Sequence, residues 1–343
     1  MGRETGGLPG ARSETLLRVA PLRPTSDGLV TIRSPAPGDA ALLVAGRDEV
    51  SRRFLGPGDD VPRPTGCIVV GGEVVGWVDF DVDRSWLGAG EVNVGYNVFA
   101  SRRGKGYATR AVQLLLHHLA VATDHHTATL LISAENERSL ALSSRLRFAA
   151  CGELDGNPYS KRPVPPLSYT DGVMTIRPQR AEDLDRDLEA KDDEQIDWLW
   201  LPGQRESWEA MSAAEQRAHA LAGLVANRDA FATGPKWSFA VDSRDVDGVA
   251  HVDCDLANDH APHGEANISY SCHPAHRGNG YVSRAVRLIL LFLADHTGAR
   301  EVHVLVDAEN GASQRVAEAV GARAVARWTN GLGRPMVRHV RRL

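Results

Sequence analysis

The sequence predicts an α/β (α+β) fold built from two copies of one unit. Two observations lead to this prediction. Runs rich in β-forming residues alternate along the 343-residue chain with runs of helical periodicity. In addition, the glycine-rich stretch Arg102–Ala108 returns as Arg277–Val282, at an offset of 174 residues (277 minus 103). That offset holds without a gap from Glu91/Glu265 to Ser139/Ser313. A period of this length is that of a domain, not of a solenoid repeat.

Composition and charge narrow the function classes. Hydrophobic residues make up 43% and charged residues 24% of the chain, which is ordinary for a globular protein. The formal net charge of −5 argues against nucleic acid as a partner. No apolar run is long enough to span a membrane, and the N-terminus lacks an apolar signal core. The four cysteines form no CxxC pair and the histidines no clear ligand pattern, so we expect a cytoplasmic protein without a metal site.

The first unit follows a loose N-terminal arm over residues 1–28, which is rich in Gly, Pro, Ser, Thr and Arg. The turn signal Asp27-Gly28 ends this arm, and a strand is expected directly after it at 29–33. A helix should begin near Asp39, where small and apolar residues follow. Two β-rich runs, 67–70 and 74–78, flank a Gly-Gly pair and predict a hairpin.

A strand, a loop and a long helix form the centre of the unit. Residues 91–99 are rich in Val, Tyr and Phe, which favours a strand. From Ala108 to Leu119 apolar residues recur at helical spacing, which predicts an amphipathic helix. A strand at 129–132, a helix at 139–146 and a terminal hairpin complete a first domain that we expect at 29–164.

A proline-rich linker is expected at 165–172, before a second domain at 173–343. There the pattern restarts, because Asp171–Arg177 copies Asp27–Arg33 at an offset of 144 (171 minus 27). The later offset is 174, so the second copy holds 30 additional residues (174 minus 144). They lie around 198–231, where several tryptophans precede a helix expected at 213–224.

The repeated glycine-rich stretch carries the strongest functional signal. It joins a strand to the N-terminus of a helix, where free backbone N–H groups and the helix dipole favour an anion. Glycines allow the backbone to approach the anion closely, and Arg102, Arg103 and Lys105 add positive charge. The residues therefore predict a phosphate-binding loop, present twice.

At this point the sequence resembles the GNAT acyl-CoA N-acyltransferases, and both halves resemble the ribosomal-protein N-terminal acetyltransferase branch. The order of strand, glycine-rich loop, helix and Asn-x-x-Ser helix, found twice, carries this resemblance. The matching motifs are Ile32-Arg33, Ile176-Arg177-Pro178, Gly95-Tyr96, Arg103–Thr109, Asn136-x-x-Ser139 with Leu146-Arg147-Phe148, and Asn310-x-x-Ser313 with Val320-Gly321.

The resemblance implies two tandem domains, each with a mixed, mostly antiparallel central sheet flanked by helices. It implies acetyl-CoA as donor, with its pyrophosphate on the loop, and an acetyl transfer to a primary amine of a small molecule or peptide by direct attack in a ternary complex. The two domains are expected to pack as an internal pseudo-dimer, and a homodimer is left open. The alternative is an acyl-CoA-binding sensor or module in which one or both domains are non-catalytic.

The resemblance also implies the donor-site residues. Backbone N–H groups around Asn97 or Val98, and around Ser271 or Cys272, would face the thioester oxygen. Asn136 and Asn310 would contact the donor or cap a helix. The full set is Asn97, Val98, Phe99, Arg103, Gly104, Lys105, Gly106, Tyr107, Ala108, Asn136 and Ser139 in the first copy, and Ser271, Cys272, Arg277, Gly278, Asn279, Gly280, Tyr281, Val282, Asn310 and Ser313 in the second.

Catalytic candidates are fewer. Glu91 and Glu265 lie on the strand before the loop, where burial could raise the pKa of a carboxylate and make it a general base; the competing interpretation is a solvated glutamate. Many members of the family carry a tyrosine acid at the position of Ser143, where the second copy has Ala317. The second loop also ends in Val282 in place of alanine. We therefore expect the copies to differ in function, with catalysis favoured in one of them.

Overall fold

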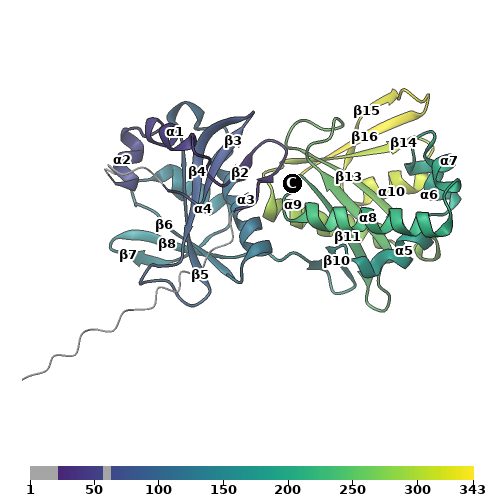
Figure 1. The fold of residues 1–343 in the computed structure, drawn as a ribbon, viewed down its shortest axis with the longest axis horizontal. Coiled ribbons are helices and arrows are strands. Elements are labelled where there is room, and N and C mark those ends of the chain that lie inside the picture. Colours follow the sequence, from purple (N-terminus) through teal and green to yellow (C-terminus); the bar gives the residue numbers. More distant parts are fainter. Residues whose placement is uncertain (1–21, 57–62) are drawn as a thin grey trace, which may run out of the picture.

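Two eight-stranded sheets, each flanked by helices, form the two halves of the molecule (Figure 1). The computed structural model describes residues 22–56 and 63–343. The strand orders are β1-β2-β3-β4-β5-β6-β8-β7 and β15-β16-β14-β13-β12-β11-β10-β9. All neighbours are antiparallel except β5–β6 and β13–β14, which are parallel. The predicted fold, two domains with mixed, mostly antiparallel sheets, is thereby confirmed.

The first domain contains the predicted elements in the predicted order. They are β1 (Thr25–Ser26), β2 (Thr31–Arg33), α1 (Asp39–Ala45), α2 (Glu49–Leu55), β3 (Gly66–Val70), β4 (Glu73–Asp81), β5 (Glu91–Val98), a 3-10 turn (Ala100–Arg102), α3 (Tyr107–Ala122), β6 (Thr127–Leu131), α4 (Glu137–Arg145), β7 (Ala149–Leu154) and β8 (Asn157–Pro163). Two elements were not predicted. The strand β1 lies in the expected arm, where Leu22 is buried, and the short helix α2 follows Asp48. The rest of the expected arm, residues 1–21, lies outside the described residues.

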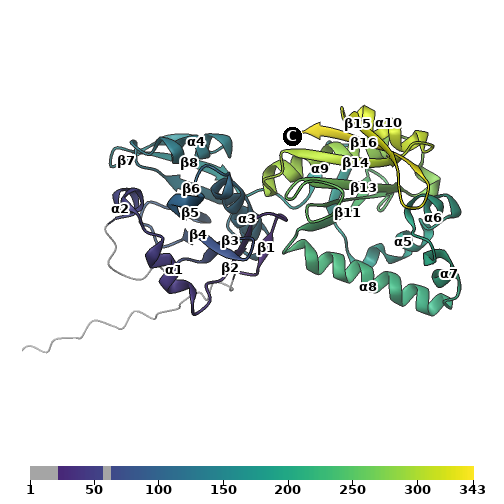
Figure 2. The ribbon, with the colours of Figure 1, turned by 90° about the horizontal axis from the view of Figure 1, so that it is seen from above.

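The second domain repeats this order with a longer helical insertion. It comprises β9 (Tyr169–Thr170), β10 (Met174–Pro178), a 3-10 turn (Ala181–Asp183), α5 (Leu184–Glu189), α6 (Asp193–Leu199), α7 (Gln204–Glu209), α8 (Ala213–Phe231), β11 (Lys236–Ser243), β12 (Ala250–Asp255), β13 (Ala266–Cys272), a 3-10 turn (Pro274–His276), α9 (Tyr281–His296), β14 (Glu301–Asp307), α10 (Gly311–Ala319), β15 (Arg323–Thr329) and β16 (Pro335–Arg342). Ser212 and Glu215 form a capping box at the start of α8. This helix runs along one side of the second sheet (Figure 2). None of the described helices is long and apolar enough to cross a membrane.

One ion pair occurs in both domains but has different surroundings in each. Arg110 of α3 donates to Asp27 at 2.8 Å, and the repeat places Arg284 of α9 2.6 Å from Asp171. The first pair is buried by the second domain, where the carbonyl of Gly264 also accepts from Arg110 at 3.1 Å. The second pair is solvent-accessible. The contact between the domains is therefore asymmetric, because a two-fold arrangement would give both pairs the same environment, and the expected internal pseudo-dimer lacks exact two-fold symmetry.

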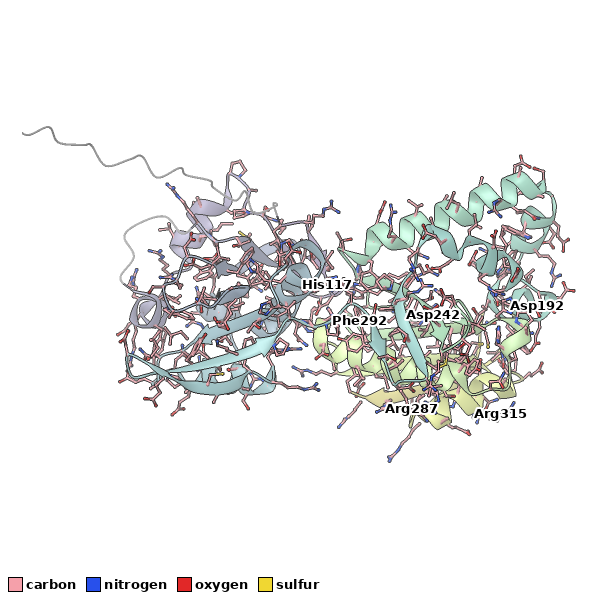
Figure 3. All side chains as sticks on the ribbon, turned by 90° about the horizontal axis from the view of Figure 1, so that it is seen from below. His117, Asp192, Asp242, Arg287, Phe292 and Arg315 are labelled. Carbon is pink, nitrogen blue, oxygen red and sulfur yellow. The ribbon has the colours of Figure 1, made fainter. Side chains whose placement is uncertain are left out.

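Histidines fill part of the junction between the domains (Figure 3). The Nδ1 atoms of His117 and His296 lie 2.9 Å apart, and each Nε2 lies 2.9–3.0 Å from a backbone carbonyl, of Phe231 and of Pro166 respectively. A carbonyl only accepts, so each Nε2 carries its proton. Burial lowers the pKa of both rings, that of His117 to about 4. The pair therefore holds at most one additional proton in mild acid, where the unfolded chain would hold two.

Mild acid is accordingly expected to destabilise the protein. Burial lowers the pKa of seven histidines below the unfolded value of about 6.5, namely His117, His118, His251, His276, His296, His303 and His339. The unfolded state binds more protons below pH 6.5, so stability is present above that pH and is lost below it. Urea unfolding between pH 7.5 and 5 should show a loss of about 1 kcal/mol per fully buried histidine for each pH unit below 6.5. His117→Asn should flatten this slope, His260→Asn should not, and a flat wild-type profile would contradict the prediction.

Candidate functional site

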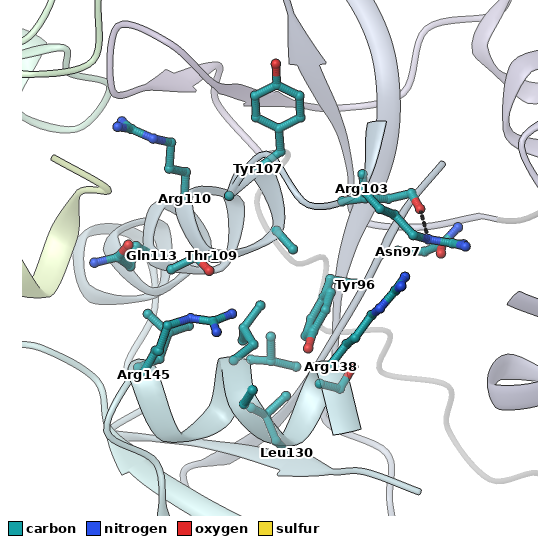
Figure 4. Close-up of a pocket in the computed structure, with 18 of the residues that line it drawn as sticks. Tyr96, Asn97, Arg103, Tyr107, Thr109, Arg110, Gln113, Leu130, Arg138 and Arg145 are labelled. Atoms are coloured by element: carbon teal, nitrogen blue, oxygen red, sulfur yellow. Dashed lines mark hydrogen bonds between the residues drawn. The ribbon is translucent and has the colours of Figure 1, made fainter. Parts of the chain in front are cut away.

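The two parallel strands of the first sheet separate and leave a cavity between them. β5 and β6 pair only from Glu91 to Asn93, although β5 continues to Val98. The separated ends, together with the loop and the faces of α3 and α4, line a cavity of about 1190 Å³ (Figure 4). β13 and β14 likewise pair at only two positions, Ala266 and Asn267. Unpaired strand backbone inside a cavity is suited to bind an extended, amide-containing ligand.

The glycine-rich loop lies at one end of this cavity, between β5 and the N-terminus of α3. Gly104 and Gly106 have φ angles of +79° and +83°, in a region that favours glycine. α3 begins at Tyr107, so the N–H groups of Tyr107, Ala108 and Thr109 have no intrahelical acceptor. These five residues all line the cavity, whereas Lys105, between the two glycines, does not. The second loop has the same geometry, with Gly278 at +80°, Gly280 at +73° and α9 beginning at Tyr281.

Arg103 braces the loop and does not project freely toward a phosphate. Its Nη atoms donate to both carboxylate oxygens of Asp48 at 2.5 and 2.8 Å, and its Nε donates to the carbonyl of Val98 at 2.8 Å. This bidentate contact holds the pKa of Asp48 well below its usual range. Asp48 also caps α2, so the loop, β5 and α2 are tied together. We expected Arg103 on the phosphate side; its guanidinium lines the cavity but is already neutralised.

Arg277 has the same role in the second domain. Its Nη atoms donate to Asp192, the N-cap of α6, at 2.7 Å, and to Glu194 at 2.6 Å. Asn279, on the same loop, donates its side-chain amide to the carbonyl of His276 at 3.1 Å. Tyr281 and Val282 pack against the hydrophobic core of this domain.

Successive backbone N–H groups of a strand point to opposite neighbouring strands, so their directions in β5 show which of the two predicted oxyanion donors, Asn97 or Val98, faces the gap. The N–H of Phe99 donates to Val75 of the β3–β4 side at 2.9 Å, whereas the carbonyl of Val92 accepts from Thr129 of β6. Even-numbered residues of β5 therefore direct their backbone groups toward β6. By this alternation we infer that the N–H of Val98, and not that of Asn97, faces the gap. In the second sheet His273 N–H donates to Val249, which by the same reasoning selects Cys272 over Ser271.

The Asn-x-x-Ser motifs act as helix caps. Asn136 accepts from the N–H of Ser139 at 3.2 Å, and Asn310 accepts from that of Ser313 at 3.0 Å. Asn136 and Ser139 also line the cavity, so a contact with the donor remains a prediction for them.

The three predicted catalytic side chains do not border the cavity. Glu91 pairs with Lys161 at 2.5 Å, and this contact lowers the pKa of Glu91, the opposite of the shift expected for a base. Glu265 accepts from the N–H groups of Arg300 and Glu301, both at 2.7 Å. Ser143 is buried and shares a hydrogen bond of 3.0 Å with Ser160. The cavity lining includes none of the three. Their catalytic roles stay untested predictions.

Tyr96 is a cavity residue to which the sequence analysis gave no role. Its ring lies between the separated strands and α4 (Figure 4). Its buried hydroxyl lies near the side chain of Ser139 but makes no hydrogen bond of normal geometry among the described residues. Burial raises the pKa of Tyr96, so the phenol is protonated at neutral pH. The equivalent Tyr270 differs, because its hydroxyl donates to the carbonyl of Ser313 at 3.1 Å. Only the position of Tyr96 within the Gly95-Tyr96 motif could have pointed to this residue.

The second domain supplies part of the cavity wall of the first. Residues from the end of α9 and the following turn line it, namely Ala294, Thr297, Gly298, Ala299 and Arg300, together with Leu343. No local sequence signal marks these residues, because their placement depends on how the domains dock.

Comparison with known proteins gives one family match. The profile of the acetyltransferase (GNAT) domain matches residues 46–149 and 174–323, which together make up most of the chain. Similar solved structures include a GNAT-family acetyltransferase from Bacillus anthracis, with 15% identity over 51% of this chain and 98% of that chain at a TM-score of 0.41. Mycobacterium smegmatis RimJ in complex with CoA-disulfide has 20% identity over 50% of this chain and 82% of its own at a TM-score of 0.42. The ribosomal-protein-S5-alanine acetyltransferase from Vibrio fischeri has 13% identity over 51% of this chain and 96% of its own, at a TM-score of 0.43. No curated protein matches the sequence.

Proposed function

The chain belongs to the acetyltransferase (GNAT) family, and on this premise we propose that its first domain binds acetyl-CoA and transfers the acetyl group to a primary amine of a small molecule or peptide. The observation that carries the proposal is the cavity between β5 and β6, with the helix N-terminus of the glycine loop at its end. A free helix N-terminus suits a pyrophosphate, and the separated strand edge suits the amides of the pantetheine arm.

The proposed reaction joins both substrates in one complex. The amine nitrogen attacks the thioester carbon, the carbonyl oxygen accepts the N–H of Val98, and the carbon–sulfur bond then breaks. The departing thiolate takes the proton of the Tyr96 hydroxyl, and the proton released by the amine restores the phenol through water. Tyr96 is the proposed acid because its hydroxyl is protonated, lies inside the cavity and, unlike that of Tyr270, donates to no backbone carbonyl among the described residues.

Substitution of this tyrosine tests the assignment. Tyr96→Phe is expected to slow the chemical step by about 100- to 10,000-fold, the usual contribution of one general acid, and to leave CoA affinity within about threefold. Tyr270→Phe is the matched control and should change neither, because its hydroxyl is held by Ser313. Single-turnover thiol release measures the step directly. A Tyr96→Phe protein with the wild-type rate would remove Tyr96 from the mechanism.

The second domain is proposed to support the first. Its Tyr270 is engaged, Ala317 replaces the family tyrosine, and Val282 packs against the core at the end of its loop. Cys67 and Cys254 are buried free thiols, which supports a reducing, cytoplasmic location.

Titration calorimetry with CoA, followed by thiol release from acetyl-CoA, tests the proposal. We expect one CoA per chain and thiol release with at least one amine from a panel of small amines and N-terminal peptides. Two equal CoA sites would contradict the assignment to the first domain. Tight CoA binding without thiol release for any amine would contradict the proposed activity and would favour an acyl-CoA-binding module.

A further inference from the structure

The arginines of the donor cavity fall into two groups. Arg102, Arg103 and Arg110, on or next to the loop, are each paired with a carboxylate, of Glu73, Asp48 and Asp27 respectively, and Arg147 lies 3.8 Å from Asp295. The charge of the arginines near the loop is thus largely neutralised within the protein. In contrast, Arg138, Arg145 and Arg300 also line the cavity but have no carboxylate within ion-pair distance among the described residues. Arg138 and Arg145 extend from α4 (Figure 4), whereas Arg300 belongs to the second domain.

Arg300 lies directly beside the loop of the first domain. A Cβ atom built on Gly106 would be 3.3 Å from Nη2 of Arg300. The backbone of Arg300 is fixed on both sides: its N–H donates to Glu265 at 2.7 Å, and its carbonyl accepts from the N–H of Leu343 at 2.8 Å. The side chain is exposed and its guanidinium has no hydrogen-bond acceptor in the part of the chain that the structure describes. A fixed backbone with a free cationic group is suited to receive an anion.

The turn that carries Arg300 is pressed against the first turns of α3. The N–H of Gly298 donates to Asp27 at 3.3 Å, and a Cβ on Gly298 would lie 2.0 Å from Cγ of Arg110. A side chain at this position would therefore push the second domain away from the loop. Glycine at 298 allows the close approach that places Arg300 at Gly106.

We propose that Arg300 binds the pyrophosphate of CoA on the loop of the first domain, so that one donor site is built from both domains. This inference rests on the proposed CoA site. Its guanidinium lies next to the loop N–H groups, and planar guanidinium donors match phosphate oxygens. The second loop has no such partner in residues 22–56 and 63–343, where no heavy atom lies within 4 Å of a Cβ on Gly278 or Gly280. The residue in the repeat position of Arg300 is His126 (300 minus 174), which lies against Gly90.

Titration calorimetry on the full-length chain tests the assignment with two ligands, CoA and 3′-dephospho-CoA. Arg300→Ala is expected to weaken both about tenfold, because one charge-assisted contact to the shared pyrophosphate is lost. Arg300→Lys should retain part of the affinity. Arg323→Ala is the matched control, an exposed arginine of the same domain that does not line the cavity, and should bind like the wild type. Thermal unfolding of each variant checks that the fold is kept.

The outcomes separate this inference from the proposed function. If the wild-type protein binds no CoA, the proposed donor site itself is contradicted. Wild-type binding with no loss in Arg300→Ala would overturn only the role of Arg300. A loss for CoA but none for 3′-dephospho-CoA would also overturn it, because the contact would then be to the 3′-phosphate.

Discussion

Gly106→Val should lower the affinity for CoA at least about 100-fold, whereas Gly280→Val should change it by less than about threefold. Gly106 has a φ of +83°, and its Cβ position faces Arg300 at 3.3 Å. A valine there would stand in front of the free N–H groups of α3 and push away the arginine, so that two kinds of phosphate contact are lost together.

The two glycines form a matched pair, because Gly280 has a similar φ of +73°. Each valine therefore carries a similar backbone strain of about 1–2 kcal/mol, and both variants should lose a similar amount of thermal stability. A difference in CoA affinity then reports on the site alone. Equal losses of CoA affinity in the two variants would show that both loops bind CoA and would contradict a single donor site.

Arg103→Glu is expected to reduce kcat/KM for acetyl-CoA about 30-fold or more, which corresponds to about 2 kcal/mol. The substitution removes the bidentate contact with Asp48 and the contact with the carbonyl of Val98, and it places two carboxylates side by side. Both the loop and the end of β5 that carries the proposed oxyanion donor would shift. Positioning errors of this kind are costly to catalysis even where no contact with the substrate is removed.

Arg277→Glu is the matched variant, because Arg277 makes the corresponding contact with Asp192. It should lose stability to a similar extent but activity to a much smaller one. Asp48→Asn should fall between wild type and Arg103→Glu, since the amide oxygen keeps the helix cap while the charge is lost. Equal losses of activity for Arg103→Glu and Arg277→Glu would contradict the division of labour between the domains.

Local features of the fold followed from the sequence. The loop, the helix α3 and the hairpin around Gly71 and Gly72 were predictable because backbone conformation and apolar spacing are short-range properties. The duplication was visible in the constant offset. The helix α2 was missed although Asp48 gives a capping signal, because its seven residues are too few to reveal a period and, unlike those of α1, do not form a continuous run of small and apolar residues.

Most of the chemistry of the site depends on contacts between distant positions. The sequence predicts Glu91 as a candidate base, but Lys161 on β8 pairs with its carboxylate. The sequence predicts Arg103 as a phosphate-side residue, but Asp48, 55 positions earlier, engages its guanidinium. Whether a tyrosine is free, as Tyr96 is, or engaged, as Tyr270 is, depends on tertiary packing. Residue type and spacing cannot specify such pairings, since each requires the folded arrangement of several elements.

The asymmetric contact between the domains also bears on how the two halves diverged. Immediately after a duplication both copies carry the same residues, yet docking of this kind gives them unequal neighbours from the start. Changes at Gly298 and Arg300 would be selected through their effect on the other copy's loop, whereas Asp124 and His126, the corresponding positions of the first copy (298 and 300 minus 174), face no such demand. The asymmetric contact would thus constrain the loop of the first domain, whereas the second domain could acquire a helical insertion and a valine in its loop without loss of the donor site.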